Sequence, residues 1–546
     1  MISRRSFITA AAAAGAYGLA IPFNLAAARR QMSARHFTVH PFIERHPEAV
    51  FVMRTSVDVK TNSPAKVAAG LRFAQSVVLP ADDNGIPVNH IIPVKPNLTS
   101  SQTGDKTFSL EYGMGIVTDP YFVEGVINGM KGLGISADRF HVREVNGPEH
   151  FGPRGYIDMC RRTGANIRDL SADSREIDQK HVNWMDVPDG YVHQKIPYLW
   201  PVNAKDTFYL NIAKFKSHST GMTLCCKNHQ GTVVNKYQRF CQGSNALKTL
   251  HYRHINPEVY DRVAADYKRH LADGYPRWEG LADPERDPEH PAFELWCQRT
   301  LDNLSATTMG LSIIEGIYGR EGCFLVGPNP PLNNTENKRE ARDYMTNVII
   351  FGKDPILVDV IGHWLAGHEP GQFGFFHLAM ERGMQKVMDP RKIPVYRWED
   401  GAAERLPLDM FARTPIRSDY IPKEKGRFID TRPQKWYMYD EPFDYSAIGE
   451  QPVSNPAKPV VTVLETCMPH PETPAVFVEY AVPENTYVQL DVLDGNCRRI
   501  ATPASGYREA GVHCAAWNYG EKNGGTWTVR LTTDGYSVET PIIVKT

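Results

Sequence analysis

The sequence has almost no net charge, because its 61 lysine and arginine residues are balanced by 62 aspartate and glutamate residues. Proteins that bind nucleic acid or an anionic membrane surface normally carry a clear positive excess. The composition therefore gives no reason to expect either partner. With 546 residues, of which 42% are hydrophobic, the chain is long enough for two or three domains with buried cores.

Beyond residue 20 the sequence lacks an apolar run long enough to span a bilayer. It begins with Ser3-Arg-Arg-Ser-Phe-Ile8, continues as an alanine-rich stretch, and reaches three small residues at Ala26–Ala28. This order is typical of a twin-arginine export signal, which we place at residues 1–28, and implies the twin-arginine translocase as a partner during export. A membrane anchor fits less well, because the apolar stretch is short. We therefore expect a periplasmic or extracellular protein of a bacterium or archaeon.

The sequence also lacks a P-loop, G-x-G-x-x-G, H-E-x-x-H or G-x-S-x-G motif in a suitable context. Its nine cysteines are an odd number, so a fully paired disulfide set within one chain is excluded. Twin-arginine export carries folded proteins that often hold a cofactor. A metal or metal-containing cofactor is therefore an open alternative, and its identity is unknown.

Strand and helix patterns alternate through the first two thirds of the chain. Val88–Lys95 is typical of a strand, Thr118 or Asp119 precedes Pro120 as a helix cap, and Phe140–Val145 is typical of the next strand. A strand, helix and strand in this order form a right-handed crossover between parallel strands. The sequence thus predicts an α/β fold with a mostly parallel sheet and flanking helices.

Composition divides the mature chain into three parts. We predict an α/β domain at residues 29–388, with a largely helical insertion at 235–294. Residues 389–458 are rich in proline, arginine and aromatics without a clear period, which favours a connector. Residues 459–546 alternate short strands and turns, which predicts a small antiparallel β-sandwich.

The stretch from Lys214 to Gly231 is the densest in reactive groups, and it follows the apolar run Phe208–Ala213. Loops that follow the carboxyl ends of parallel strands collect ligands. Lysines and amides there would hold a small anionic molecule, and a histidine or glutamate would move a proton. The catalytic candidates are Lys214, His218, Lys227 and Glu315. The ligand-binding candidates are Lys95, Asn97, Lys216, Asn228 and Asp359.

A metal site is the competing interpretation of the same stretch. His218, Cys225, Cys226 and His229 supply imidazole and thiol ligands within a short span. Adjacent cysteines rarely hold one ion, however, and the spacing is not that of a zinc finger or ferredoxin. The two cysteines are also explained as buried apolar residues of a helix.

Several ordered motifs between Val50 and Met388 resemble a bacterial and archaeal family known as domain of unknown function 362. They are Val94–Leu98, Val117–Pro120, Glu144, Lys214–Gly231, Glu315–Gly322, Asn347–Pro355, Val358-Asp359 and Gly367–Pro370. The chain departs from the family pattern at Glu315-Gly316, where Asp-Gly is expected, and in its insertion. The resemblance names a family without a settled chemistry.

Two further resemblances concern arrangement. The order of strand, Thr-Asp-Pro helix, glycine and strand is similar to the N-terminal domain of nickel-pincer-dependent 2-hydroxyacid racemases, which implies Lys214 or Lys227 with His218 as cofactor holders. The strands and turns between Tyr480 and Arg530 resemble the immunoglobulin-like modules of flagellar-hook capping proteins, which attach or space. The function expected is thus an enzyme or ligand-binding protein, and the alternative is a non-catalytic cell-surface or periplasmic binding protein.

Overall fold

The computed structural model describes the greater part of the chain. The described residues are 35–81, 84–98, 114–145, 151–152, 154–168, 181–218, 221–234, 254–276, 278, 292–321, 343–418, 423–424, 427–428, 438–448, 459–463, 475–519 and 525–544. The export signal predicted at residues 1–28 lies outside them. No helix within these ranges is long and apolar enough to cross a membrane.

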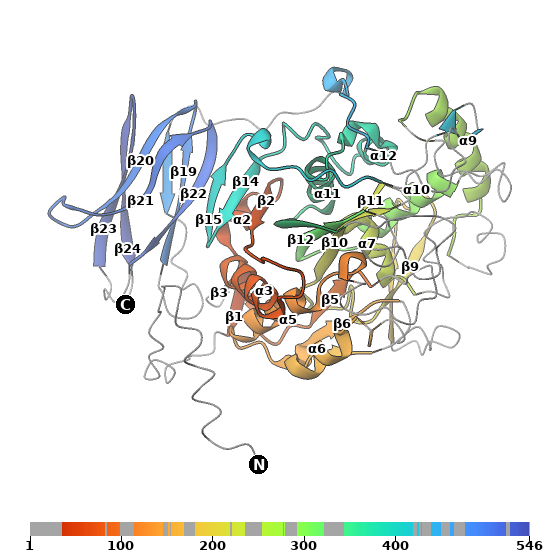
Figure 1. Cartoon of the computed structure of the whole chain (residues 1–546), viewed down its shortest axis with the longest axis horizontal. Helices are drawn as coiled ribbons and strands as arrows, with labels where there is room; N and C mark the ends of the chain where they lie inside the picture. The colour runs from red at the N-terminus through yellow and green to blue at the C-terminus, as the bar shows by residue number, and fades with distance from the viewer. Residues whose placement is uncertain are drawn as a thin grey trace, which may run out of the picture.

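One large mixed sheet runs through the molecule (Figure 1). Its strands within the described residues, in order across the sheet, are β18 (Val460–Val463), β19 (Ala475–Val482), β22 (Gly511–Asn518), β15 (Ala402–Arg405), β14 (Val395–Glu399), β2 (Val50–Arg54), β13 (Asp343–Gly352), β12 (Leu311–Arg320), β10 (Leu210–His218), β5 (Ile92–Pro96), β6 (Phe140–Val142) and β7 (Asn166–Ile167), with β11 (Gly221–Thr223) paired to β10.

The half of this sheet from β12 to β7 is parallel, whereas β13 runs antiparallel to both of its neighbours, β12 and β2. The α/β class and the flanking helices are confirmed, but the sheet is mixed and not mostly parallel as predicted, because β13 and the strands from β18 to β14 pair antiparallel. Parallel strands place their carboxyl ends along one edge, so Lys95, Lys214 and Glu315 come together there although they are far apart in the sequence.

Helices cover both faces because the strands are apolar on both sides. In β2, Phe51 and Met53 belong to one buried core and Val50 and Val52 to the other, as the two-residue repeat of a strand requires. The first core includes α3 (Ser63–Val77), α5 (Pro120–Lys131) and α6 (Tyr156–Thr163). The second includes α7 (Cys225–His229), α10 (Ala292–Ser305), α11 (Pro355–Leu365) and α12 (Gly374–Glu381).

Helices α3 and α5 approach each other through glycine. A Cβ atom at Gly70 would lie 2.0 Å from the Phe122 carbonyl oxygen, and one at Gly125 would lie 2.1 Å from that of Val67. Only residues without a side chain permit this contact. Asp119 caps α5 by accepting the Tyr121 N–H at 2.8 Å, which confirms the predicted start of that helix.

The segment expected to be a connector contributes to the large sheet. Strand β14 pairs in parallel with β2, and β15 continues the sheet as a hairpin, so residues 395–405 are not connector. Trp398 explains why this hairpin docks, because its ring is buried against Phe51 and Phe351. The predicted helical insertion contains α9 (Val259–Ala272) among its described residues.

The C-terminal region is built from two antiparallel sheets. The strands β21 (Arg499–Arg508), β20 (Thr486–Leu493), β23 (Gly525–Thr533) and β24 (Ser537–Val544) form the second sheet, in that order. Apolar side chains from both sheets, such as Val478 and Leu490, share one core. The first is the β18–β19–β22 end of the large sheet, which is connected to β15 through the pairing of Ala403 with Cys514 (Figure 1).

Candidate functional site

Strand β10 places its predicted site residues inside the protein. All nine residues of the strand are buried, including Lys214, Lys216 and His218. Lys214 is in register with Glu315 of β12, and Lys216 is in register with Arg320 after a bulge. The strand then turns back through β11, where Lys216 faces Thr223 and His218 faces Gly221. The predicted groups therefore lie at the carboxyl edge of the parallel strands, as expected.

Lys95 and the asparagines form one buried network at this edge. The Lys95 ammonium donates to Glu144 Oε2 at 2.7 Å and to Asn228 Oδ1 at 3.0 Å. Asn97 also donates to Asn228 Oδ1, at 3.2 Å, and Asn228 donates to Asn211 Oδ1 at 2.8 Å. The structure thus brings three predicted binding residues together, with much of their bonding capacity used within the network.

Lys214 and Glu315 belong to a second buried network. Lys214 Nζ lies 2.8 Å from Glu315 Oε2, and both side chains are fully buried. The same ammonium lies 3.9 Å from the centre of the Tyr318 ring. Glu315 also accepts the N–H groups of Asp119 and Ile317, at 3.0 and 2.9 Å. These contacts account for both carboxylate oxygens, so the pair has the geometry of a structural ion pair.

Sequence reasoning missed the partners of this second network. Lys66 Nζ lies 2.8 Å from Asp119 Oδ2, with neither side chain exposed, and Tyr318 donates to the same oxygen at 2.8 Å. The signal in the sequence was that Lys66 falls on the stripe of α3 that also carries Phe73 and Val77. A lysine on a buried stripe requires a carboxylate partner from another element.

His218, a predicted proton-transfer group, has a strongly shifted pKa. Burial lowers its pKa well below the ordinary value, and the positive charges of Lys227 and Lys216 lower the pKa further. The imidazole is therefore neutral at neutral pH. A buried neutral base beside two ammonium groups is able to accept a proton once an anion has neutralised those charges.

The hairpin of β10 and β11 is held in place from the second core. Gly221 has a φ of +112°, and a Cβ atom there would lie 3.0 Å from the Phe373 ring and 3.3 Å from His363 Nε2. The Ser418 hydroxyl lies within donating distance of two carbonyl oxygens, that of His218 at 2.9 Å and that of Gly221 at 2.8 Å. These contacts fix the backbone that carries His218.

Asp359, a predicted ligand-binding residue, instead caps α7. Its two carboxylate oxygens accept the N–H groups of Cys225 and Cys226 at 2.7 and 2.9 Å. Burial raises the pKa of Asp359 to about 7, and it raises the pKa of both thiols well above the ordinary value. The two cysteines are thus protonated side chains of a buried helix, as the alternative to metal binding expected.

The predicted metal ligands are not assembled into a metal site. His229 lies 3.0 Å from the Tyr209 hydroxyl through Nδ1 and 2.9 Å from Thr307 Oγ1 through Nε2, so both ring nitrogens have hydrogen-bond partners. Within the ranges that the structure describes, no three His, Cys, Asp or Glu side chains converge in a way that could hold an ion. The correction has a physical reason, since α7 turns Cys225 and Cys226 toward Asp359 and the apolar core.

A cofactor held by lysine and histidine fits this arrangement only in part. Lys214 is committed to Glu315 and the Tyr318 ring, so it does not fit the role of holder. Lys227 is half-buried and near enough to His218 to lower its pKa, so this pair is the one that would contact such a group.

Comparison with known proteins identifies the family of this region. The model of a family described as Domain of unknown function (DUF362) matches residues 92–363. No curated protein matches the chain. The crystal structure of an engineered protein aligns over 90% of this chain and 99% of its own, but 10% identity and a TM-score of 0.12 are too low to indicate a shared fold. Residues 92–363, which contain both buried networks apart from Lys66, are therefore the part of the chain that matches the DUF362 family.

Proposed function

We propose that this chain binds a small anionic molecule at the carboxyl end of β10 and transfers a proton to or from it. Lys216 and Lys227 would hold the anion, and His218 would accept or donate the proton. The observation that carries the proposal is the position of a neutral, fully buried imidazole within the field of these two ammonium groups.

Other predicted residues hold the strands that carry this site in place. Lys95, Asn97 and Asn228 are bonded to one another or to Glu144, and Lys214 is bonded to Glu315. Networks of this kind fix the ends of β5, β10 and β12, so that the groups at the edge keep their geometry. We therefore assign Lys214 and Glu315 as positioning residues and Lys216, His218 and Lys227 as the residues that contact substrate.

Calorimetric titration with phosphate and with succinate tests the proposal. Because an anion would neutralise the lysine charges, the pKa of His218 should rise on binding, and the protein should take up a proton. Titration at pH 6.5 in two buffers of different ionisation enthalpy measures this uptake. Lys227→Ala should weaken anion binding at least about tenfold, since it removes a partly buried charge contact, and His218→Gln should abolish the proton uptake.

The control variant is Lys205→Ala, which removes an exposed lysine from the loop before β10, at the opposite edge of the sheet. It should bind both anions as the unchanged protein does. Equal binding by the Lys227→Ala and Lys205→Ala proteins would refute the site. Anion binding without proton uptake would leave a binding protein without the proposed proton transfer.

We also propose that the protein is exported by the twin-arginine pathway. The support is the Ser3-Arg-Arg-Ser-Phe-Ile8 motif with its apolar stretch and small residues at Ala26–Ala28. Replacing Arg4 and Arg5 by lysine should keep the protein in the cytoplasmic fraction, as detected by cell fractionation. Unchanged export of that double variant would contradict the proposal.

A further inference from the structure

A pocket of about 670 Å³ lies at the edge of the sheet opposite to the proposed site. Its walls come from the segment after α10, the start of α11, and residues 383–387 after α12. The segment Thr307–Met309 immediately precedes β12, so this edge carries the amino ends of β10 and β12. A cavity of this volume is in the range of small-molecule sites.

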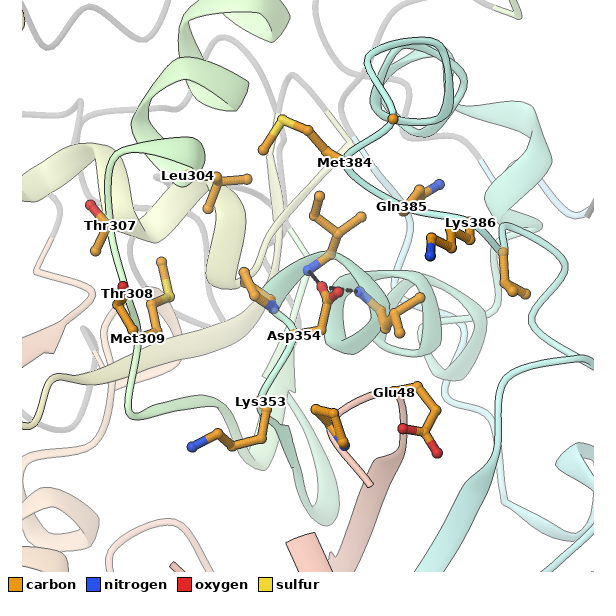
Figure 2. Close-up of a pocket in the computed structure, with 16 residues that line it drawn as sticks. Glu48, Leu304, Thr307, Thr308, Met309, Lys353, Asp354, Met384, Gln385 and Lys386 are labelled. Carbon is orange, nitrogen blue, oxygen red and sulfur yellow. Dashed lines mark hydrogen bonds between the residues drawn. The ribbon is translucent and has the colours of Figure 1, made fainter. Parts of the chain in front are cut away.

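The floor and one wall of the pocket are apolar. Leu304, Met309 and Ile356 are at least nine-tenths buried, and Met384 also lines the pocket (Figure 2). Unbranched methionine side chains adapt to ligands of different shapes. The lining therefore suits the apolar body of a ligand.

Three of the charged residues that line the pocket already have partners within the protein. Lys353 pairs with Glu44 at 2.8 Å, and Glu48 lies 3.4 Å from His46. Asp354 accepts the N–H groups of Ile356 and Leu357, at 2.7 and 3.2 Å, and so occupies the amino end of α11. An anion is thus not expected at that helix end.

Lys386 is the remaining charged residue that lines the pocket. It is exposed, and no ion pair joins it to another residue in the described part of the chain. Figure 2 shows Lys386 on the side of the pocket opposite Thr307 and Leu304, with Asp354 between them. A negative group would be attracted to Lys386 and repelled by the Asp354 carboxylate, which orients a bound molecule along the pocket.

From this geometry we infer a second binding site, for a small amphipathic monocarboxylate whose carboxylate faces Lys386 and whose apolar chain lies against Leu304, Met309 and Met384. The site shares no residue with the one formed by Lys216, His218 and Lys227. The inference is therefore independent of the proposed function.

Titration calorimetry with octanoate, octylamine and octan-1-ol tests this site. Octanoate should bind most tightly, and it should raise the melting temperature by mass action. Lys386→Glu should weaken octanoate binding about fivefold, because an exposed ion pair contributes little and the reversed charge adds repulsion. The same variant should leave octan-1-ol binding unchanged. Met384→Trp, which fills the pocket, should abolish binding of octanoate.

Lys268→Glu is the matched control, since it reverses an exposed lysine on α9 that does not line the pocket. It should bind octanoate like the unchanged protein. Tighter binding of octylamine or octan-1-ol than of octanoate would overturn the inference, as would no binding of any of the three. Unchanged octanoate affinity in both the Lys386→Glu and Met384→Trp proteins would overturn it as well.

Discussion

Lys214 of β10 and Glu315 of β12 form an ion pair of 2.8 Å in which neither side chain is exposed. The two residues are brought into register by parallel strands. Removing one member leaves a charge without its partner in a medium of low polarity, which typically costs about 3–5 kcal/mol. The pair therefore contributes chiefly to folding, and through it to the position of Lys216 and His218.

We predict that Lys214→Met lowers the free energy of unfolding by about 3–5 kcal/mol, because the Glu315 carboxylate loses its cation. The double variant Lys214→Met/Glu315→Met should lose less than the sum of the two single variants. A double-mutant cycle in urea measures this coupling. Strict additivity would show that the two side chains do not act as a pair.

Gly231 is predicted to be required for the Lys95 network. A Cβ atom at this position would lie 2.5 Å from Glu144 Oε1 and 2.6 Å from Lys95 Cε. Gly231→Ala should therefore destabilise the protein by about 1–3 kcal/mol, the usual cost of overpacking. Gly495→Ala is the control, because no atom lies within 4 Å of a Cβ atom there. Equal denaturation midpoints for the two variants would contradict this prediction.

His46 should make stability depend on pH at alkaline values. Burial alone would lower its pKa, but hydrogen bonds to Glu479 and Glu48 outweigh that effect and raise the pKa to about 9. The protonated form is thus favoured in the folded state. This contribution is fully present below about pH 6.5, the ordinary value, and is lost as the pH rises through about 9.

Glu479→Gln tests the His46 interaction, which joins α2 (Pro41–Arg45) and the residue after it to β19. The variant should be less stable than the unchanged protein by about 1 kcal/mol at pH 6. At pH 10 this difference should shrink to the small part that comes from the pair of Arg45 with Glu479, because Arg45 stays charged there. Denaturant unfolding at pH 6 and pH 10 measures the difference in the free energy of unfolding between the variant and the unchanged protein. Glu539→Gln, which removes an exposed pair with Arg530, should show a small gap that does not close at pH 10.

The buried cysteines are predicted to be unreactive in the folded protein. Cys225 and Cys226 are buried with pKa values raised by burial, whereas Cys497 is exposed. A thiol reagent at pH 8 should therefore label one equivalent less in Cys497→Ser and the same number in Cys225→Ser. Loss of an equivalent in the Cys225→Ser variant would show that α7 opens in the native state.

Local chemistry in the sequence determined the elements of this fold. Asp119-Pro120 predicted the start of α5, and Asp354-Pro355 has the same form at the start of α11, because the aspartate oxygen accepts the first free N–H groups of the helix. The two-residue and 3.6-residue apolar repeats predicted strands and helices on both sides of a sheet. These signals depend on neighbouring residues only, so they are visible in one sequence.

The tertiary structure alone decided how the charged residues are used. Nothing local shows that Lys214 meets Glu315, that Lys95 meets Glu144, or that Asp359 caps α7. Strand order sets these contacts, and burial then requires each charge to find a partner. The hairpin at 395–405 was missed for a related reason, because Trp398 docks on aromatic rings contributed by strands far away in the sequence. The sequence by itself thus predicted that Lys95, Lys214 and Glu315 lie at the ends of strands, and the packed structure decided which charged groups are bonded to one another within the protein.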